Sequence, residues 1–317
     1  MTPLSGHHLT RPDSTIRYWS GGTEGPTVVF LHGATLDHHS WTPQAEALRD
    51  RYRVVVPDLR GHGASTGRFD FDAAVEDVLA LVEQLPARRV VLVGLSLGAN
   101  IAQEVIRRRP EAVLALVAAD ATCNTAARHP FAASFTVAAM QSQAALAGDG
   151  FARQAARATA TDPQVQQYVM GVNAHRTNSE TVDILTSLLT SALRPEPSYR
   201  LPVPALLVHG ERDQIGDIAS TMRGWAEREP LARYAVIPHA GHASNLDNPD
   251  DFTDLLTGFI DDVTAEAAAE AQAEQLYLRY GARPWHLIPE ATRKHYRELV
   301  AAGIGSQGQP LLPPPDS

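Results

Sequence analysis

The chain has a single cysteine, Cys123, among its 317 residues, so no disulfide can form within it. This excludes the small disulfide-stapled secreted domains and favours a reducing environment. Residues 1–22 lack the basic start and apolar core of a secretory signal. No uninterrupted apolar run reaches the roughly 18 residues that a membrane-spanning helix requires. We therefore expect a cytoplasmic protein with no membrane partner.

Positive charge is also scarce, because 27 lysines and arginines face 36 aspartates and glutamates, which gives a formal net charge of −9. Nucleic-acid binding requires a basic surface, so nucleic acid is not an expected partner. The run Arg107–Arg109 instead fits the solvated end of a helix. With 44% hydrophobic and 20% charged residues, the chain has the composition of a globular protein with one large core, or with a core and a smaller domain.

A serine between glycines is the most informative feature that is present. The pentapeptide Gly94–Gly98 has Ser96 at its centre, follows the apolar run Val90–Val93 and precedes a helix-like stretch at 99–108. A strand that turns tightly into a helix holds its middle residue in a strained conformation, and only glycine leaves enough room at the flanking positions. The serine hydroxyl then projects above the sheet as a nucleophile. The amide of Leu97 lies at the helix start, where free donors favour an oxyanion.

Three other expected strands also lead into chemically useful residues, and they cover residues 27–31, 204–208 and 234–238. Ala34 follows the first strand and offers a second backbone amide, Asp213 follows the second, and His242 follows the third. Near-continuous Val and Leu strands separated by helices, as at 72–85, predict a parallel sheet covered on both faces. Active sites in such sheets lie at the carboxyl ends of the strands, where all of these residues occur.

In this order the motifs resemble the α/β-hydrolase family, over about residues 10–262. The resemblance also rests on the strand and loop Val54–Ser65. The segment Gly241–Pro249 is similar to the one after the catalytic histidine of small esterases and enol-lactonases. The implied fold is α/β, with a mostly parallel sheet, helices on both faces and an inserted helical cap. One departure is Ala99, where many members have a second glycine, and it adds only a methyl group.

The resemblance further implies a triad of Ser96, Asp213 and His242, with the amides of Ala34 and Leu97 as the oxyanion hole. No metal or organic cofactor is required for such a site. An alternative triad acid is Asp120, which follows the expected strand 113–118, because either carboxylate is able to orient the histidine.

Several other histidines occur in motifs where the ring more often hydrogen-bonds a loop than transfers protons. They are His32, His38, His39, His62 and His209, while His239 precedes the turn that leads to His242. A metal site built on His38 and His39 is not expected, because adjacent side chains usually point apart.

The expected hydrolase core comprises residues 1–120 and 201–262, and residues 121–200 form the cap. Helix signals in the cap include Thr161–Pro163, a cap followed by a first-turn proline, and Thr177–Glu180, a capping box. Apolar cap residues could line an acyl or alcohol site; they are Phe131, Phe135, Met140, Tyr168, Met170 and Leu185. The alternative is that these side chains only hold the cap helices together.

The carboxyl end extends beyond the hydrolase pattern. Residues 263–302 predict a helical hairpin, and residues 303–317, which are rich in proline, predict a flexible tail. We expect the hairpin to pack on the body through Trp285, Leu287 and Leu299. The alternatives are a homodimer contact through the hairpin, or shading of the active-site mouth.

The expected function is that of a serine hydrolase of the carboxylesterase or lactonase type, acting on a small to medium apolar ester or lactone through an acyl-enzyme on Ser96. The same triad also supports carbon–carbon bond hydrolysis, perhydrolysis or acyl transfer. A second class of alternative is a receptor-like member that binds a ligand without turning it over. Epoxide hydrolases and haloalkane dehalogenases are disfavoured, because those relatives place an aspartate where this chain has Ser96.

Overall fold

The computed structural model describes residues 4–22, 25–127, 150–279, 281 and 283–303. The chain divides into two compact units, Met1–Gly258 and Phe259–Ser317. Among the helices of the described residues, none combines the length and the apolar character needed to cross a bilayer.

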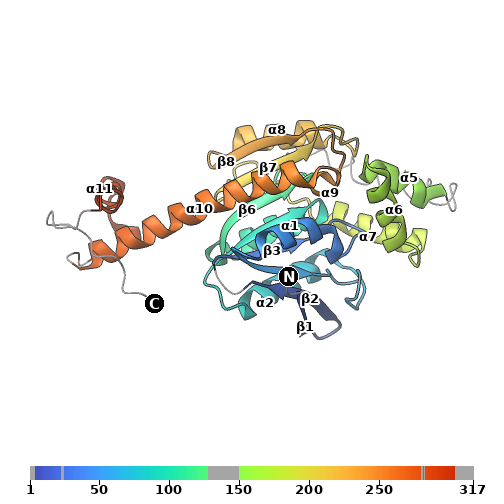
Figure 1. Cartoon of the computed structure of the whole chain (residues 1–317), viewed down its shortest axis with the longest axis horizontal. Helices are drawn as coiled ribbons and strands as arrows, with labels where there is room; N and C mark the ends of the chain where they lie inside the picture. The colour runs from blue at the N-terminus through green and yellow to red at the C-terminus, as the bar shows by residue number, and fades with distance from the viewer. Residues whose placement is uncertain (1–3, 23–24, 128–149, 280, 282, 304–317) are drawn as a thin grey trace. The chain divides into compact units, whose positions relative to one another are not determined.

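The first unit is built on one eight-stranded sheet with the strand order β1-β2-β4-β3-β5-β6-β7-β8 (Figure 1). The first two strands are antiparallel to their neighbours, and the remaining pairs are parallel. The strands are β1 (Ser5–Thr10), β2 (Thr15–Gly21), β3 (Thr27–Leu31), β4 (Arg53–Pro57), β5 (Val90–Leu95), β6 (Val113–Ala119), β7 (Ala205–Gly210) and β8 (Ala232–Ile237). The expected mostly parallel sheet is confirmed.

Helices cover both faces of this sheet because each central strand is apolar on both sides. Side chains alternate between the faces, so Val29 and Leu31 pack in one cluster with residues of several helices. Between them, Phe30 points the other way and lies 5.2 Å from Trp41, whose ring lies 5.9 Å from Phe252. The helices on the first face are α2 (Phe71–Gln84), α3 (Leu97–Arg108) and α8 (Ile218–Arg228). Those on the second are η1 (His38–Trp41), α1 (Thr42–Leu48) and the start of α10 (Pro249–Leu278).

Three further helices of the described residues lie between β6 and β7 in the chain, where the sequence predicts a cap. They are α5 (Gly150–Thr159), α6 (Pro163–Val172) and α7 (Asn178–Ser191), and they lie together beside the sheet (Figure 1). The Asp162 carboxylate caps α6. Thr177 and Glu180 form the expected capping box at the start of α7. The described part of the unit also contains two short helices, η2 (Pro110–Ala112) and α9 (Ser244–Asp247).

The second unit contains the rest of α10, the turn η3 (Trp285–Leu287) and α11 (Glu290–Ala301). Six of its apolar residues form a cluster; they are Ala273, Tyr277, Trp285 and Ile288, with Tyr296 and Val300 against them. The indole of Trp285 donates to Glu270 at 2.8 Å. The prediction that Leu287 is a buried anchor is wrong, because its side chain is 64% exposed. It lies in the short turn, where the neighbouring indole already fills the cluster.

A buried ion pair connects the loop after β4 to α2. The Arg60 guanidinium donates to both carboxylate oxygens of Asp77, at 2.7 and 3.0 Å, and each side chain is only 4% exposed. Arg11 donates to the same carboxylate at 3.0 Å. Because two cations share Asp77, its removal would leave a buried guanidinium with one partner fewer.

We expect Asp77→Ala to lower the free energy of unfolding by about 3 kcal/mol, because the buried Arg60 guanidinium would keep only the exposed carboxylate of Asp13 as its ion-pair partner. Urea unfolding measures this difference. Glu83→Ala is the matched control, since Glu83 pairs with Arg109 at 3.0 Å on the surface, where the two side chains are 56% and 47% exposed. That control should cost less than about 1 kcal/mol. Equal losses in the two variants would contradict the role of the buried pair.

Candidate active site

Ser96 occupies the turn between β5 and α3 in a conformation that few residues adopt. Its φ is 49° and its ψ is −112°. A Cβ atom on Gly94 would lie 2.3 Å from the backbone nitrogen of Ala99, and one on Gly98 would lie 2.1 Å from the carbonyl oxygen of Leu31. Backbone atoms therefore press on both glycines, as the motif predicts. Ser96 alone is partly exposed between buried neighbours.

The backbone of Ser96 is held on both sides. Its N–H donates to the carbonyl of Ala119 at 2.8 Å, and its own carbonyl accepts from Asn100 at 3.0 Å. Leu97 is the first residue of α3, so its N–H has no partner within the helix and lies at the positive end of the helix dipole. That amide is suited to stabilising an anion beside the serine hydroxyl.

Asp213 and His242 form a hydrogen-bonded pair in the loops after β7 and β8. The imidazole Nδ1 lies 2.8 Å from Asp213 Oδ2, and the other carboxylate oxygen accepts from the N–H of Ile215 at 2.8 Å. The Asp213 side chain is fully buried and that of His242 is 9% exposed. Burial alone would lower the pKa of His242, but the hydrogen bond and the charge of Asp213 outweigh it and raise that pKa above its ordinary value.

Asp120, the alternative acid, lies directly after β6 with its side chain fully buried and a φ of 48°. Its carboxylate accepts from the N–H of Gly210 at 2.7 Å and from the Ser244 hydroxyl. Burial raises the pKa of this carboxyl to about 7. Of the two acids, Asp213 is the one that is hydrogen-bonded to the His242 imidazole.

Consecutive residues at the end of β6 connect the serine turn to the histidine loop. The carbonyl of Ala119 accepts from Ser96, and the carboxylate of Asp120 accepts from Ser244, which lies two positions after His242 in the chain. The carboxyl edge of the sheet thus gathers the three segments that carry the expected triad, as parallel strands allow.

Ala34 lies in the loop after β3, the strand beside β5. The two strands are in register, with Leu31 opposite Gly94, so their loops leave the sheet side by side. The loop turns through Thr35, which has a φ of 60°. This tight turn leaves Ala34 only partly buried.

Asp247 links the histidine loop to the cap, a role that the sequence analysis missed. One carboxylate oxygen accepts from Gly241 at 2.7 Å and from Thr161 at 2.8 Å, and the other accepts from Asp162 at 3.0 Å. The two contacts to the cap join residues 86 and 85 positions apart. The sequence alone showed an aspartate in the segment after His242, but it gave no sign that this aspartate contacts the cap.

The cap also binds the loop after β3. The Tyr168 hydroxyl donates to Asp37 at 2.7 Å, and the Asn173 side chain donates to the carbonyl of Thr35 at 3.0 Å. The loop that carries Ala34 is therefore held by α6 and by the residue that follows this helix. Tyr168 is one of the expected substrate-lining residues; its hydroxyl makes this contact, and a lining role for its ring stays a prediction.

The structure describes only some of the expected substrate-lining residues, and these differ in exposure. Phe131, Phe135 and Met140 lie outside the described residues. Leu185 is half-buried on α7, and Met170 is 41% exposed. A lining role for Leu185 stays a prediction.

Other histidines of the strand-end motifs are bound to loop backbone. His32 accepts from the N–H of Leu59 at 2.9 Å, and the His62 Nδ1 lies 2.9 Å from the carbonyl of Arg60. Burial lowers the pKa of both rings, so these imidazoles stay neutral. The His209 Nδ1 lies 2.8 Å from the carbonyl of the next residue.

The adjacent rings of His38 and His39 do not point apart, contrary to the expectation. Their centroids are 3.9 Å apart, and with Asp37 they place three possible ligand atoms within 4.8 Å of one another. These atoms already have partners, however. His38 Nδ1 lies 2.8 Å from Asp58, and the Asp37 carboxylate accepts from Tyr168 and from the N–H of His39. We therefore interpret Asp37, His38 and His39 as a turn held by hydrogen bonds.

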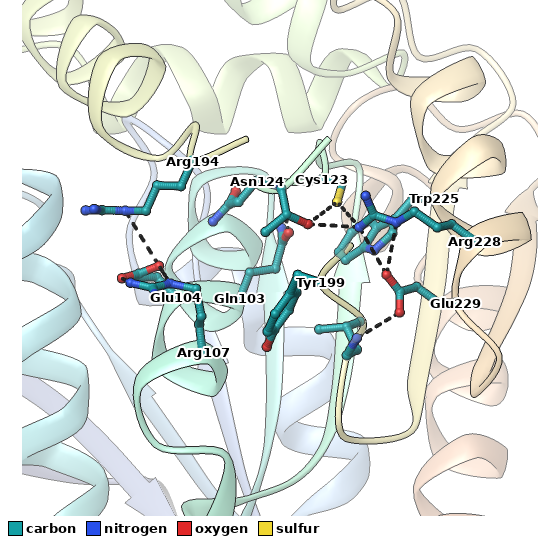
Figure 2. Close-up of a pocket in the computed structure, with 12 residues that line it drawn as sticks. Gln103, Glu104, Arg107, Cys123, Asn124, Arg194, Tyr199, Trp225, Arg228 and Glu229 are labelled. Atoms are coloured by element: carbon teal, nitrogen blue, oxygen red, sulfur yellow. Dashed lines mark hydrogen bonds and ion pairs between the residues drawn. The ribbon is translucent and has the colours of Figure 1, made fainter. Parts of the chain in front are cut away.

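A small cavity lies away from these residues, on the flank of α3 (Figure 2). Figure 2 shows the Arg228 guanidinium between Cys123 and Glu229. It donates to the Cys123 sulfur at 2.9 Å, to Thr125 at 2.9 Å and to Glu229 at 3.1 Å. Because its charged groups pair with one another and Ser96 does not line it, this cavity is not the catalytic pocket.

A family model and individual relatives both assign this chain to the same protein family. A model of the alpha/beta hydrolase family matches residues 28–255. The chain is 34% identical over 253 residues to the pimeloyl-(acyl-carrier protein) methyl ester esterase of Chromobacterium violaceum, covering 74% of this chain and 93% of that protein. It is 26% identical over 255 residues to the 2-(acetamidomethylene)succinate hydrolase of Mesorhizobium japonicum, covering 75% and 88% of the two proteins.

Solved structures with the same fold include the enol-lactonase of Burkholderia xenovorans, with a TM-score of 0.69 and 23% identity over 80% of this chain and 100% of that one. A thermophilic esterase of Thermogutta terrifontis also has a TM-score of 0.69 and 23% identity, over 82% and 99% of the two chains. At these identities the likeness establishes the fold alone.

The tight turn at Ser96 yields a stability prediction. Gly98→Ala places a methyl group against the Leu31 carbonyl, so we expect the free energy of unfolding to fall by about 1–3 kcal/mol through overpacking. Gly224→Ala, in α8, is the control, because a Cβ there meets nothing within 4 Å. That change should be neutral or stabilise the protein by about 0.5–1 kcal/mol. Urea unfolding of both variants compares them, and an unperturbed Gly98→Ala protein would contradict the close approach of α3 to β3.

Proposed function

Because this chain belongs to the alpha/beta hydrolase family, we propose that it is a serine hydrolase that cleaves a carboxylic ester or lactone of a small to medium apolar molecule. The observation that carries the proposal is the Asp213–His242 hydrogen bond of 2.8 Å at the sheet edge where Ser96 projects from its strained turn. A nucleophile, a base and an acid that orients the base are the groups that acyl transfer requires.

In the proposed reaction, Ser96 Oγ attacks the carbonyl carbon while its proton passes to Nε2 of His242. Asp213 holds Nδ1 of the ring, which fixes the tautomer with Nε2 free and stabilises the imidazolium that forms. The imidazolium then gives its proton to the departing alkoxide. The acyl group remains on the serine oxygen as an ester.

The tetrahedral oxyanion of each step is assigned to the amides of Ala34 and Leu97. The first amide leaves β3 beside β5, and the second opens α3, where the helix dipole favours negative charge. Each donor is expected to contribute about 3 kcal/mol to the transition state. Water, deprotonated by His242, then attacks the acyl-enzyme and releases the acid through a second tetrahedral intermediate.

Substrate class is inferred from the relatives. One of them is by name a methyl ester esterase with 34% identity to this chain, which supports a carboxylic ester. The apolar side chain of Leu185 on the cap is assigned to the acyl or alcohol pocket. A cytoplasmic location and a homodimer through the carboxyl-terminal hairpin are further predictions, each resting on the sequence.

We expect a fluorophosphonate probe to label the wild-type protein once per chain, at Ser96. We also expect turnover of p-nitrophenyl acetate and butyrate. Ser96→Ala should abolish labelling, and His242→Ala should abolish turnover, because the serine loses its base. Intact-mass spectrometry and absorbance assays measure these outcomes. Thr125→Ala, in the cavity on α3, is a control that should retain activity. A folded wild-type protein with neither labelling nor turnover would leave ligand binding as the better account.

The ester-cleaving rate should fall toward acid with a midpoint above pH 6.5. Only the neutral imidazole accepts a proton, and the Asp213 hydrogen bond raises the pKa of His242 above its ordinary value of 6.5. The neutral fraction therefore disappears as the pH falls through the raised pKa. Asp213→Asn should move this limb of kcat/KM to lower pH and greatly reduce the rate. An acid limb that stays in place in Asp213→Asn would contradict the assignment.

A further inference from the structure

Asp120 is a fully buried carboxylic acid that the proposed reaction leaves without a role. Three donors converge on it, namely the N–H of Gly210 at 2.7 Å, the N–H of Ser244 at 3.3 Å and the Ser244 hydroxyl. One oxygen therefore binds the end of β7 and the other binds the histidine loop. Such a set suits an ionised carboxylate, because a carboxylate accepts at both oxygens.

The backbone around Asp120 makes the same connections. Its N–H donates to the carbonyl of Val208 on β7 at 2.9 Å, while the preceding carbonyl, that of Ala119, accepts from Ser96. Gly210, held by the Asp120 carboxylate, in turn accepts from the N–H of Asp213 at 3.2 Å. Two consecutive residues thus touch the segments that carry the nucleophile, the acid and the base.

The charge of Asp120 is coupled to the histidine. The titratable groups that face it are His242, whose positive form favours the Asp120 carboxylate, and Asp213, whose negative charge opposes it. Burial is the largest influence and raises the pKa of Asp120 to about 7. In return, the Asp120 charge is one of the causes that raise the pKa of His242.

Resting on the proposed function, we infer that Asp120 is a second positioning acid of this site. Its buried carboxylate fixes the His242 loop against the Asp213 turn and stabilises the imidazolium that forms when Ser96 transfers its proton. It acts without touching the substrate or the ring. Asp213 orients the imidazole through a hydrogen bond, whereas Asp120 supplies a second negative charge and the anchor for the loop.

Asp120→Asn separates charge from shape. An asparagine side chain keeps the size of the residue, still accepts from Gly210 and donates to the Ser244 hydroxyl, but it carries no charge and no longer accepts from the Ser244 N–H at 3.3 Å. Asp58→Asn is the matched control. Asp58 is also a fully buried carboxylate directly after a strand of the same sheet, β4, and it accepts from the N–H groups of His38 and Ala64. It is not among the groups that shift the pKa of His242.

The test is an NMR titration of the His242 ring in the full chain, together with the pH profile of kcat/KM for p-nitrophenyl acetate. We expect Asp120→Asn to lower the pKa of His242 by roughly one unit, to move the acid limb by the same amount, and to reduce kcat about tenfold. Asp58→Asn should leave both the pKa and the limb in place. A merely structural role would change stability alone, so an unshifted pKa and limb in folded Asp120→Asn would overturn the inference.

A second measurement covers the case in which Asp120→Asn fails to fold. Coupling between two titrating groups is reciprocal, so the Asp120 carboxyl carbon, followed by NMR, should titrate at higher pH in His242→Gln than in the wild type. Equal titration of Asp120 in both proteins would overturn the inference. Failure of the proposed function is distinguishable, because a wild-type protein without ester turnover still allows both NMR titrations.

Discussion

The close approach of α3 to β3 and β5 is the constraint on which the rest of the site depends. No side chain fits at Gly94 or Gly98, because backbone atoms of Ala99 and Leu31 already occupy the space. The helix can begin there only if the intervening residue adopts a positive φ, and that residue is Ser96. The strain and the exposure of Ser96 therefore have the same cause, which is the packing of one helix on two parallel strands.

The loops around this turn are held by acids that accept from backbone N–H groups. Asp58 follows β4, Asp120 follows β6 and Asp213 lies in the loop after β7. Each accepts from backbone N–H groups, so buried negative charge is compensated by hydrogen bonds rather than by lysine or arginine. Asp247 binds the cap in the same way, because its carboxylate accepts from two backbone N–H groups directly before α6. Fixing loops through their backbone leaves the side chains of these loops free for chemistry.

The parts of the fold that could be predicted are those set by local pattern. Strand 27–31 was placed to the residue, because its apolar run ends at a glycine turn. The capping box at Thr177 and the turn at Ser96 were likewise readable. Contacts made across long separations were not, such as that of Tyr168 with Asp37, 131 positions away. The helix that continues through residue 262, where the core was expected to end, follows from a stretch with neither proline nor glycine between Gly258 and Leu278.

A hydrogen-bonded aspartate and histidine do not by themselves make a site. Among the residues that the structure describes, two such pairs share a distance of 2.8 Å, Asp58 with His38 and Asp213 with His242, while Asp37 and His39 lie 3.3 Å apart. The His38 ring stacks on Trp19 at 3.5 Å and lies against His39, so its neighbours are other rings. The His242 loop is instead tied through Asp120 to the strand end that holds Ser96. What distinguishes the second pair is therefore its connection to a strained serine, and that connection is made by backbone geometry at the end of β6.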